Sequence, residues 1–137
     1  MTIKGWLPST KLLYVDNSPI HGKGVFARLP IRRRELFEIA PFIVLDIERA
    51  SLPTTSPILW NFAFKFQRER DGFVYIGIGL GFACLYNHSN TPSASVRWNL
   101  VTNTMEFYAT HNIKEKEEIF IDYGVDWFKN RPHIEMK

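Results

Sequence analysis

The sequence predicts a mainly β fold made of many short strands. Seven segments are rich in β-branched and aromatic residues, a composition typical of strands. Turn-forming groups such as Asp71-Gly72 and Asn90-Thr91-Pro92 separate these segments, so each strand is expected to be short. The predicted strands are Leu12 to Val15, Gly24 to Ala27, Leu36 to Leu45, Phe73 to Ile78, Ser95 to Leu100, Thr104 to Ala109 and Glu118 to Tyr123.

Residues 46 to 66 interrupt the strand pattern. Pro53, Ser56 and Pro57 punctuate this region, and Ile58 to Phe66 is predicted to form one short helix. We interpret the region as a short mixed insertion between two β-rich halves.

One spacing occurs twice along the chain. In each copy an alanine, an isoleucine and a glutamate are spaced by four residues and lead directly into a predicted strand. The two copies are Ala27, Ile31 and Glu35 before Leu36-Phe37, and Ala109, Ile113 and Glu117 before Glu118-Ile119-Phe120. The sequence leaves two explanations open, namely one structural unit used twice or convergent turn chemistry.

The composition predicts one domain and limits its partners. A chain of 137 residues with 45% hydrophobic residues has the size and apolar content of a single compact domain. The net charge is only +3, and Arg32-Arg33-Arg34 is the one short basic run, so direct nucleic-acid binding is not expected. Cys84 is the single cysteine, which excludes an internal disulfide and a cysteine-rich zinc site. We therefore expect no metal.

No targeting or membrane segment is recognisable. Met1 to Leu13 lacks the apolar stretch of a secretory signal. The uncharged stretch from Gly72 to Asn87 is shorter than the roughly 20 residues of a membrane helix, and glycines interrupt it. We expect an intracellular, cytoplasmic protein, or a nuclear one if the host is a eukaryote.

Three segments place small or polar residues where a buried strand pattern would otherwise continue. In His21-Gly22-Lys23-Gly24-Val25-Phe26-Ala27, two glycines let the backbone approach a ligand, although an ordinary tight turn has the same pattern. In Leu85-Tyr86-Asn87-His88-Ser89-Asn90-Thr91-Pro92-Ser93, an Asn-His-Ser run follows an apolar strand, and its side chains need partners either in a ligand or in the protein itself. In Glu117-Glu118-Ile119-Phe120-Ile121-Asp122-Tyr123-Gly124, a strand ends in an acid, an aromatic hydroxyl and a glycine, as strands at a surface rim also do.

The order of these three segments resembles the SET-domain protein lysine methyltransferases. The resemblance runs from about Leu13 to Tyr123 and fits the short bacterial and viral members of the family. It implies a SET-domain (β-clip) fold of several short sheets, in which the Asn-His-Ser segment and the C-terminal strand cross in a knot-like arrangement. A single SET domain would then span residues 1–137, with a core at about 13–124 and a C-terminal closing segment at about 125–137.

The resemblance also implies an activity and a set of site residues. The activity is transfer of a methyl group from S-adenosylmethionine to a lysine side chain of a protein or peptide, for example a basic protein such as a histone. In the family the first motif and the Asn-His pair hold the methyl donor, and the last tyrosine points its hydroxyl at the transfer centre. The residues implied are Lys23, Gly24, Val25, Asn87 and His88 for the cofactor, and Tyr123 for catalysis.

Further residues are expected to complete the site. The candidate walls of the lysine channel are Tyr86, Tyr108 and Ile121, and Trp127 or Phe128 is expected to close over the adenine. Tyr123 is a poor general base because an unperturbed tyrosine titrates near pH 10, so we assign it the orientation of the amine and the methyl group.

The chain also departs from the family pattern. Asn90 and Ser93 stand where many members have a cysteine and an asparagine, and no cysteine-rich C-terminal module is present. The segment from Val125 to Lys137, or the partner subunit of a homodimer, must then complete the channel. Arg34 and Lys116 replace turn glycines, which predicts turns without positive φ.

Two alternatives to a methyltransferase are considered from the sequence. A SET-like fold could serve as a non-catalytic peptide-binding module, but the intact glycines, Asn87, His88 and Tyr123 favour catalysis. The segment Gly77-Ile78-Gly79-Leu80-Gly81 has the glycine spacing of a nucleotide-binding loop. Another apolar strand follows it, however, where that loop requires a helix, so a doubly wound nucleotide-binding fold is not expected.

Overall fold

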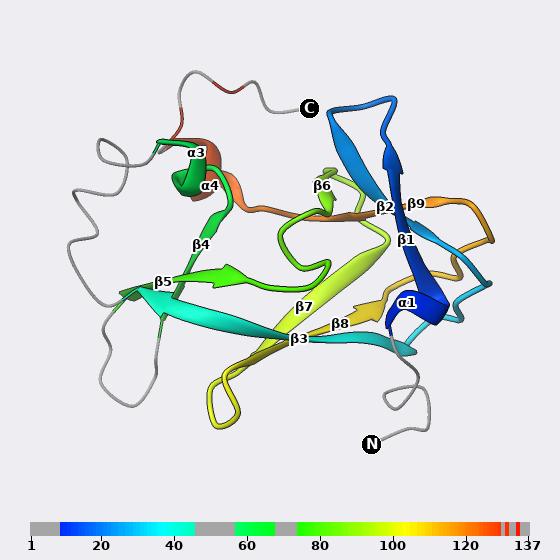
Figure 1. Ribbon diagram of the computed structural model, residues 1–137, viewed down its shortest axis with the longest axis horizontal. Helices are drawn as coiled ribbons and strands as arrows, with labels where there is room; N and C mark the ends of the chain where they lie inside the picture. Colours follow the sequence, from blue (N-terminus) through cyan, green and yellow to red (C-terminus); the bar gives the residue numbers. More distant parts are fainter. Residues whose placement is uncertain (1–8, 46–56, 68–73, 130, 132–133, 135–137) are drawn as a thin grey trace.

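Two β-sheets carry the hydrophobic core of the protein (Figure 1). This computed structural model describes residues 9–45, 57–67, 74–129, 131 and 134. The smaller sheet has the strand order β1-β2-β9-β6, and the larger sheet has the order β4-β5-β3-β8-β7. The strands are β1 (Leu13–Asn17), β2 (Lys23–Ala27), β3 (Leu36–Leu45), β4 (Ala63–Gln67), β5 (Val74–Gly79), β6 (Asn87–His88), β7 (Ala94–Asn99), β8 (Thr104–Ala109) and β9 (Glu118–Ile121). The short helices are α1 (Ser9–Leu12), α3 (Pro57–Trp60) and α4 (Val125–Lys129).

The predicted mainly β fold is confirmed, and each of the seven predicted strands overlaps an observed one. The helix predicted for Ile58 to Phe66 is wrong in its second half, because α3 ends at Trp60 and β4 begins at Ala63. Ala63 and Phe66 of β4 are buried, and the strand pairs with β5, so Phe66 stacks on the ring of Tyr75. Residues 46–56 of the insertion lie outside the described residues. Within the described part of the chain, no helix has the length and hydropathy needed to cross a membrane.

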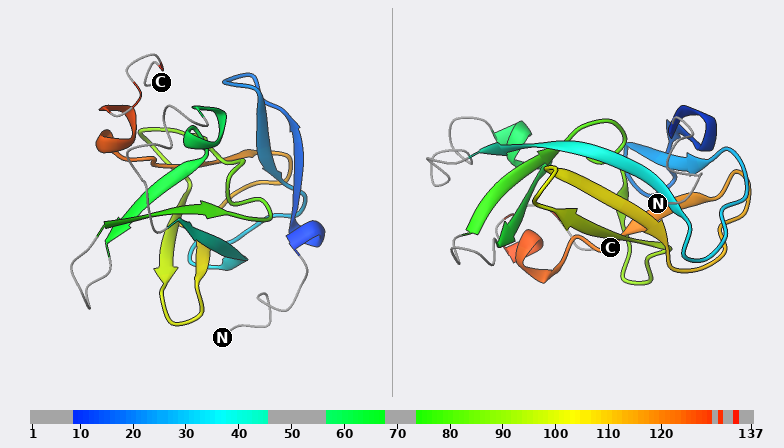
Figure 2. Two further views of the ribbon diagram at one scale, coloured as in Figure 1. Left: turned by 60° about the vertical axis from the view of Figure 1, so that its left-hand side comes forward. Right: turned by 90° about the horizontal axis from the view of Figure 1, so that it is seen from below.

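The C-terminal strand β9 lies between two segments that are distant in sequence. It pairs with β2 in antiparallel fashion on one side and with β6 in parallel fashion on the other. The segment that follows β6 continues along β9, because the Ser89 amide donates to the Ile121 carbonyl at 3.0 Å and the Phe120 amide donates to Ser93 Oγ at 3.2 Å. The Asn-His-Ser segment and the C-terminal strand therefore lie side by side, and the knot-like crossing that the resemblance implies stays a prediction. Figure 2 shows that α3 and α4 lie at the same end of the molecule.

The recurring sequence spacing corresponds to one structural unit used twice. Ile31 and Ile113 form an isolated bridge in which each amide donates to the carbonyl of the other residue, at 2.9 and 2.7 Å. The two turns exchange matching bonds, because the Arg34 amide donates to the Ala109 carbonyl and the Lys116 amide donates to the Ala27 carbonyl. Convergent turn chemistry would not require these reciprocal bonds, so they support the repeated unit.

The prediction that these turns avoid positive φ is wrong. Arg34 has a φ of 74° and Lys116 a φ of 72°, both in the left-handed region that favours glycine. The reciprocal tertiary hydrogen bonds hold both residues there in spite of the steric cost, which is about 1–2 kcal/mol for a residue with a Cβ. The structure therefore keeps the turn geometry while changing the residue.

Candidate functional site

Asn87 and Glu118 hold the turn of the first motif, His21-Gly22-Lys23-Gly24. The Nδ2 atom of Asn87 lies 3.0 Å from the His21 carbonyl, 3.0 Å from the Lys23 carbonyl and 2.9 Å from Glu118 Oε2, so its two N–H groups serve three acceptors. A Cβ on Gly24 would lie 2.3 Å from Glu118 Oε2, which explains why this position has a glycine. The amide of Asn87 thus joins the first motif to β6 and β9.

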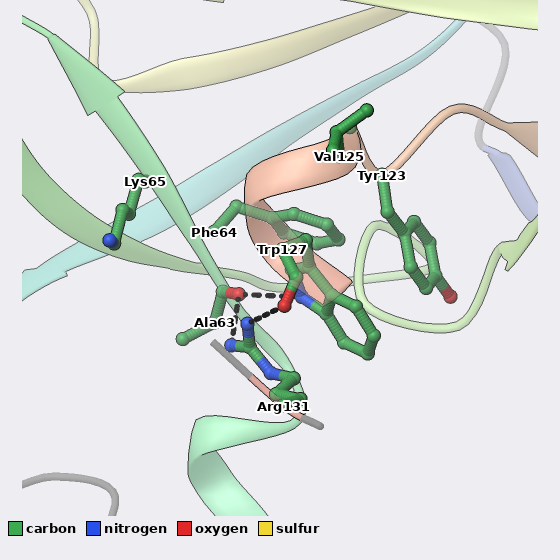
Figure 3. Close-up of a pocket in the computed structure, with 8 residues that line it drawn as sticks. Ala63, Phe64, Lys65, Tyr123, Val125, Trp127 and Arg131 are labelled. Carbon is green, nitrogen blue, oxygen red and sulfur yellow. Dashed lines mark hydrogen bonds between the residues drawn. The ribbon is translucent and has the colours of Figure 1, made fainter. Parts of the chain in front are cut away.

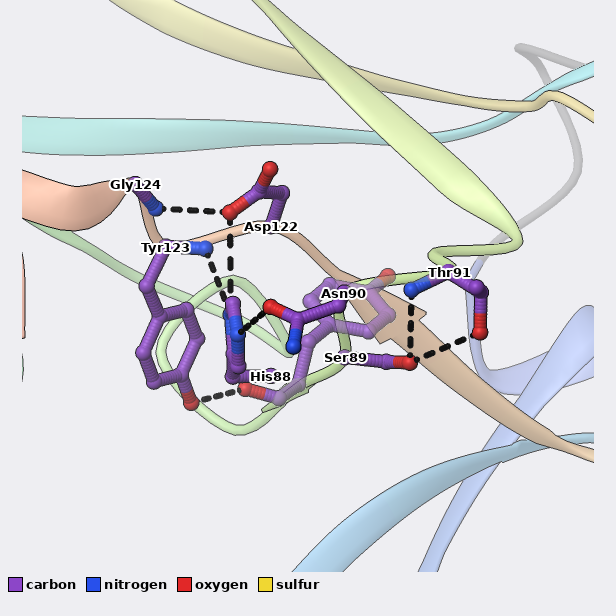
Figure 4. Close-up of polar contacts among 8 residues, drawn as sticks. His88, Ser89, Asn90, Thr91, Asp122, Tyr123 and Gly124 are labelled. Carbon is purple, nitrogen blue, oxygen red and sulfur yellow. Dashed lines mark hydrogen bonds and ion pairs between the residues drawn. The ribbon is translucent and has the colours of Figure 1, made fainter. Parts of the chain in front are cut away.

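His88 holds the backbone of Tyr123 (Figure 4). The Tyr123 amide donates to His88 Nδ1 at 3.0 Å, so this nitrogen must carry a lone pair. The other ring nitrogen, Nε2, then donates to Asn90 Oδ1 at 3.1 Å. These two bonds assign the Nε2–H tautomer and tie the Asn-His-Ser segment to the end of β9.

The Tyr123 hydroxyl has a fixed direction. It donates to the Tyr86 carbonyl at 2.5 Å, and the tyrosine ring lies 4.7 Å from the Trp127 ring, 5.4 Å from Phe64 and 6.1 Å from Phe128. Burial is the main cause that raises the pKa of Tyr123 above its ordinary value of 10. The hydroxyl therefore stays protonated at neutral pH and cannot act as a general base.

A buried carboxylate supports the segment that carries this carbonyl. Glu38, which is 4% exposed, accepts a hydrogen bond from the Tyr86 hydroxyl at 2.7 Å and another from the Phe82 amide at 2.8 Å. Desolvation raises the pKa of Glu38 from 4.5 to about 7, and the two hydrogen bonds oppose that rise. The sequence analysis did not identify Glu38, although an acid within the apolar stretch Leu36-Phe37-Glu38-Ile39-Ala40 is a signal of a buried polar role.

A cavity of about 330 Å³ opens beside Tyr123 (Figure 3). It lies between β4, the end of β9 and the C-terminal segment that contains α4. Its lining residues are Ala63, Phe64, Lys65, Tyr123, Gly124, Val125, Trp127 and Arg131. The cavity therefore brings the insertion and the C-terminal segment together at the tyrosine.

Comparison with known proteins identifies the family. The model of the SET domain matches residues 22–124, which is most of the chain. The chain belongs to the SET-domain family. A histone-lysine N-methyltransferase of Schizosaccharomyces pombe, specific for lysine 37 of histone H3, is 26% identical to this SET protein over 119 residues, covering 86% of this chain and 78% of the relative. The crystal structure of a Plasmodium falciparum protein assigned as a histone methyltransferase has a TM-score of 0.62 and 29% identity, covering 85% of this chain and 96% of that one.

This SET protein is therefore a protein-lysine methyltransferase, and S-adenosylmethionine is the methyl donor of SET methyltransferases. Among the described residues, no cluster of three or more His, Cys, Asp or Glu side chains is placed to hold a metal ion.

The SET fold brings most of the predicted site residues together. The first motif, the Asn-His pair and Tyr123 are joined by the hydrogen bonds of Asn87 and His88. Trp127 lies against the Tyr123 ring, and Ile121 pairs with His88 across the β6–β9 ladder.

Two residues predicted to wall the lysine channel, Tyr86 and Tyr108, have contacts with the larger sheet. Tyr86 is fully buried, with its ring 4.7 Å from Phe107 and its hydroxyl on Glu38. Tyr108 lies on β8 between Leu36 and Ser95, and no contact described for it reaches Tyr123. Their assignment as channel walls stays a prediction.

Proposed function

We propose that Tyr123 is the catalytic residue of this methyltransferase and that it acts by orienting the reacting groups. The observation that carries this proposal is that the Tyr123 hydroxyl is fixed on the Tyr86 carbonyl, in a residue that lines the cavity. Because the hydroxyl proton is used in that bond, the lone pairs of the Tyr123 oxygen point away from the Tyr86 carbonyl and can accept a hydrogen bond. An acceptor in this position can align a neutral amine with the methyl group that it attacks.

We further propose that Lys23, Gly24, Val25, Asn87, His88 and Trp127 hold S-adenosylmethionine. Two features of these residues fit that ligand. A Cβ placed on Gly22 would meet no atom within 4 Å, so the turn of the first motif has open space in front of it. The Nδ2 atom of Asn87 is fully used, but no donor among the described residues reaches its Oδ1 atom, which is therefore available to the ammonium group of a methionine moiety.

The chemistry of the amine follows from this arrangement. When bound, S-adenosylmethionine supplies a methyl group on a positively charged sulfur. The attacking lysine must be neutral, whereas a free lysine has a pKa of about 10.4. Burial near the aromatic rings around Tyr123 disfavours the ammonium form and lowers that pKa. The proton leaves to solvent before attack, because Tyr123 stays protonated and cannot accept it.

The substrate is a lysine side chain of a protein, and we propose a histone because the similar S. pombe enzyme is specific for lysine 37 of histone H3. This substrate class agrees with an intracellular location, nuclear in a eukaryotic host. Tyr86, Tyr108 and Ile121 stay proposed as channel walls, and a homodimer stays the alternative means of completing the channel.

Calorimetry with S-adenosylmethionine tests the binding part of the proposal, and transfer of labelled methyl groups to a mixture of histones tests the activity. The natural protein is expected to bind and to transfer. Asn87→Ala, measured where circular dichroism shows a folded variant, is expected to lose affinity by about tenfold or more, as the loss of a hydrogen bond to a charged group does. Asn112→Ala is the matched control, because Asn112 accepts the Arg33 amide in a turn that contributes no proposed site residue. Absence of binding by the folded natural protein would reject the proposed site and favour a peptide-binding module.

A further inference from the structure

Arg131 is a buried cation between two tryptophans. Its side chain is 2% exposed, and its guanidinium carbon lies 4.2 Å from the centre of the Trp60 ring and 4.1 Å from that of the Trp127 ring. Both distances are within the range of a favourable cation–π contact. Trp60 is the last residue of α3 and Trp127 belongs to α4, so the guanidinium joins the insertion to the C-terminal segment.

The guanidinium also bonds three backbone carbonyls. Nη1 donates to the Trp127 carbonyl at 2.9 Å, and Nη2 donates to the Ala63 carbonyl at 3.1 Å and to the Trp60 carbonyl. The Trp127 indole N–H donates to the same Ala63 carbonyl at 3.1 Å (Figure 3). Burial lowers the pKa of Arg131 from its ordinary value to about 10, which leaves it charged at neutral pH. One cation therefore connects α3, the first residue of β4 and α4.

This connection reaches the proposed catalytic residue through two side chains, those of Trp127 and Phe64. The Trp127 ring, which lies on the guanidinium, also contacts the Tyr123 ring at a centroid distance of 4.7 Å. From the insertion, Phe64 follows Ala63 in β4 and contacts the Tyr123 ring at 5.4 Å. Arg131 thus fixes the two elements whose aromatic rings flank Tyr123, and it lines the same cavity.

We propose that Arg131 is a positioning residue for methyl transfer, which clamps the C-terminal segment onto the insertion so that Trp127 and Phe64 hold the Tyr123 ring in place. This inference rests on the proposed function of Tyr123. The clamp joins two elements that flank Tyr123 through contacts within one chain. Guanidinium is suited to this role because its planar fork bonds several carbonyls while its faces lie on aromatic rings.

The experiment compares Arg131→Met, Arg131→Lys and a matched control. Arg131→Met fills the space without charge, whereas Arg131→Lys keeps a cation between the rings but loses the fork. Arg28→Met is the control, since the Arg28 guanidinium lies 5.2 Å from the ring centre of Tyr14 on β1 and outside the cavity. Each variant is examined for kcat and KM with labelled S-adenosylmethionine, at a temperature where circular dichroism shows it folded.

Arg131→Met is expected to lower kcat by about 100-fold, the usual cost of a displacement of about 1 Å at a reacting centre. The kcat of Arg131→Lys is expected to be about tenfold higher than that of Arg131→Met, because the lysine ammonium still lies between the tryptophans. Arg28→Met should keep kcat within about twofold. A purely structural role would change the unfolding temperature and leave kcat of the folded variant unchanged, and that result would overturn the proposal.

A second readout does not depend on activity. The Trp127 indole N–H is expected to exchange with solvent at least about tenfold faster in Arg131→Met, because local opening of α4 becomes easier, while the Trp98 indole serves as an internal reference. Unchanged exchange at Trp127 would overturn the clamp. If the natural protein transfers no methyl group, the proposed function fails, and this exchange measurement still decides whether the clamp exists. If Arg131→Met does not fold, Arg131→Lys must show faster exchange and a lower kcat than the natural protein.

Discussion

Replacing Glu38 by glutamine should change how the stability of the protein depends on pH. The folded state raises the pKa of this buried carboxyl from 4.5 to about 7, whereas the unfolded chain leaves it at its ordinary value. Between these two values the unfolded chain has released the proton and the folded protein still holds it. The stabilising contribution of Glu38 is therefore complete below pH 4.5 and is lost as the pH rises through about 7.

The size of this effect follows from the two pKa values. Each pH unit between them changes the free energy of unfolding by about 1.4 kcal/mol, so the whole interval amounts to about 3 kcal/mol. Glutamine in Glu38→Gln has no proton to release. Its altered hydrogen bonds to Tyr86 and Phe82 add an offset that does not vary with pH in this interval.

Urea denaturation between pH 4.5 and pH 8 measures the effect. The free energy of unfolding of the natural protein, taken relative to Glu38→Gln, should fall by about 3 kcal/mol over this range. Glu115→Gln removes one exposed negative charge and serves as the control for net charge. A difference between the natural protein and Glu38→Gln that stays constant with pH would refute the reasoning.

Three further predictions follow from the site and the turns. Asn90→Ala removes the acceptor of the His88 Nε2–H group, so kcat for labelled methyl transfer should fall about tenfold in the folded variant, and an unchanged kcat would contradict the role of Asn90. Arg34→Gly should leave the protein as stable or more stable by up to about 1 kcal/mol in thermal denaturation, because φ is 74° there, whereas Arg33→Gly next to it should destabilise by about 0.5–1 kcal/mol. Gly24→Ala should lower the free energy of unfolding by at least about 1 kcal/mol, since its Cβ would lie 2.3 Å from the buried Oε2 atom of Glu118. If urea denaturation gave Gly24→Ala the same free energy of unfolding as the natural protein, this close approach would be contradicted.

The composition of the strands and the order of the three motifs were sufficient to predict the fold, and the three motifs proved to lie together in it. Strand composition is a local property, so the mainly β pattern could be recognised directly in the sequence. The motifs converge because Asn87 and His88 lie beside β9 in the small sheet, and Tyr123 follows the end of that strand.

The parts that sequence analysis missed depend on partners that are distant in the chain. Arg131 lies 71 residues from Trp60, and nothing local marks it as different from a surface arginine. Glu38 is 48 residues from Tyr86, and its burial follows from the packing of the larger sheet. The left-handed geometry of Arg34 likewise depends on the distant Ala109 carbonyl, which explains why a rule based on local turns failed there.

Transfer of labelled methyl groups by the natural protein and by Tyr123→Phe, with histones as substrate, tests the central claim most directly. The natural protein should transfer, while Tyr123→Phe should bind S-adenosylmethionine within about twofold of the natural affinity and lose about 100-fold in kcat, because the ring remains but the orienting oxygen is gone. Tyr14→Phe, on β1, is the matched control and should transfer at the natural rate. A natural rate in Tyr123→Phe, or binding without any transfer by the natural protein, would contradict the account.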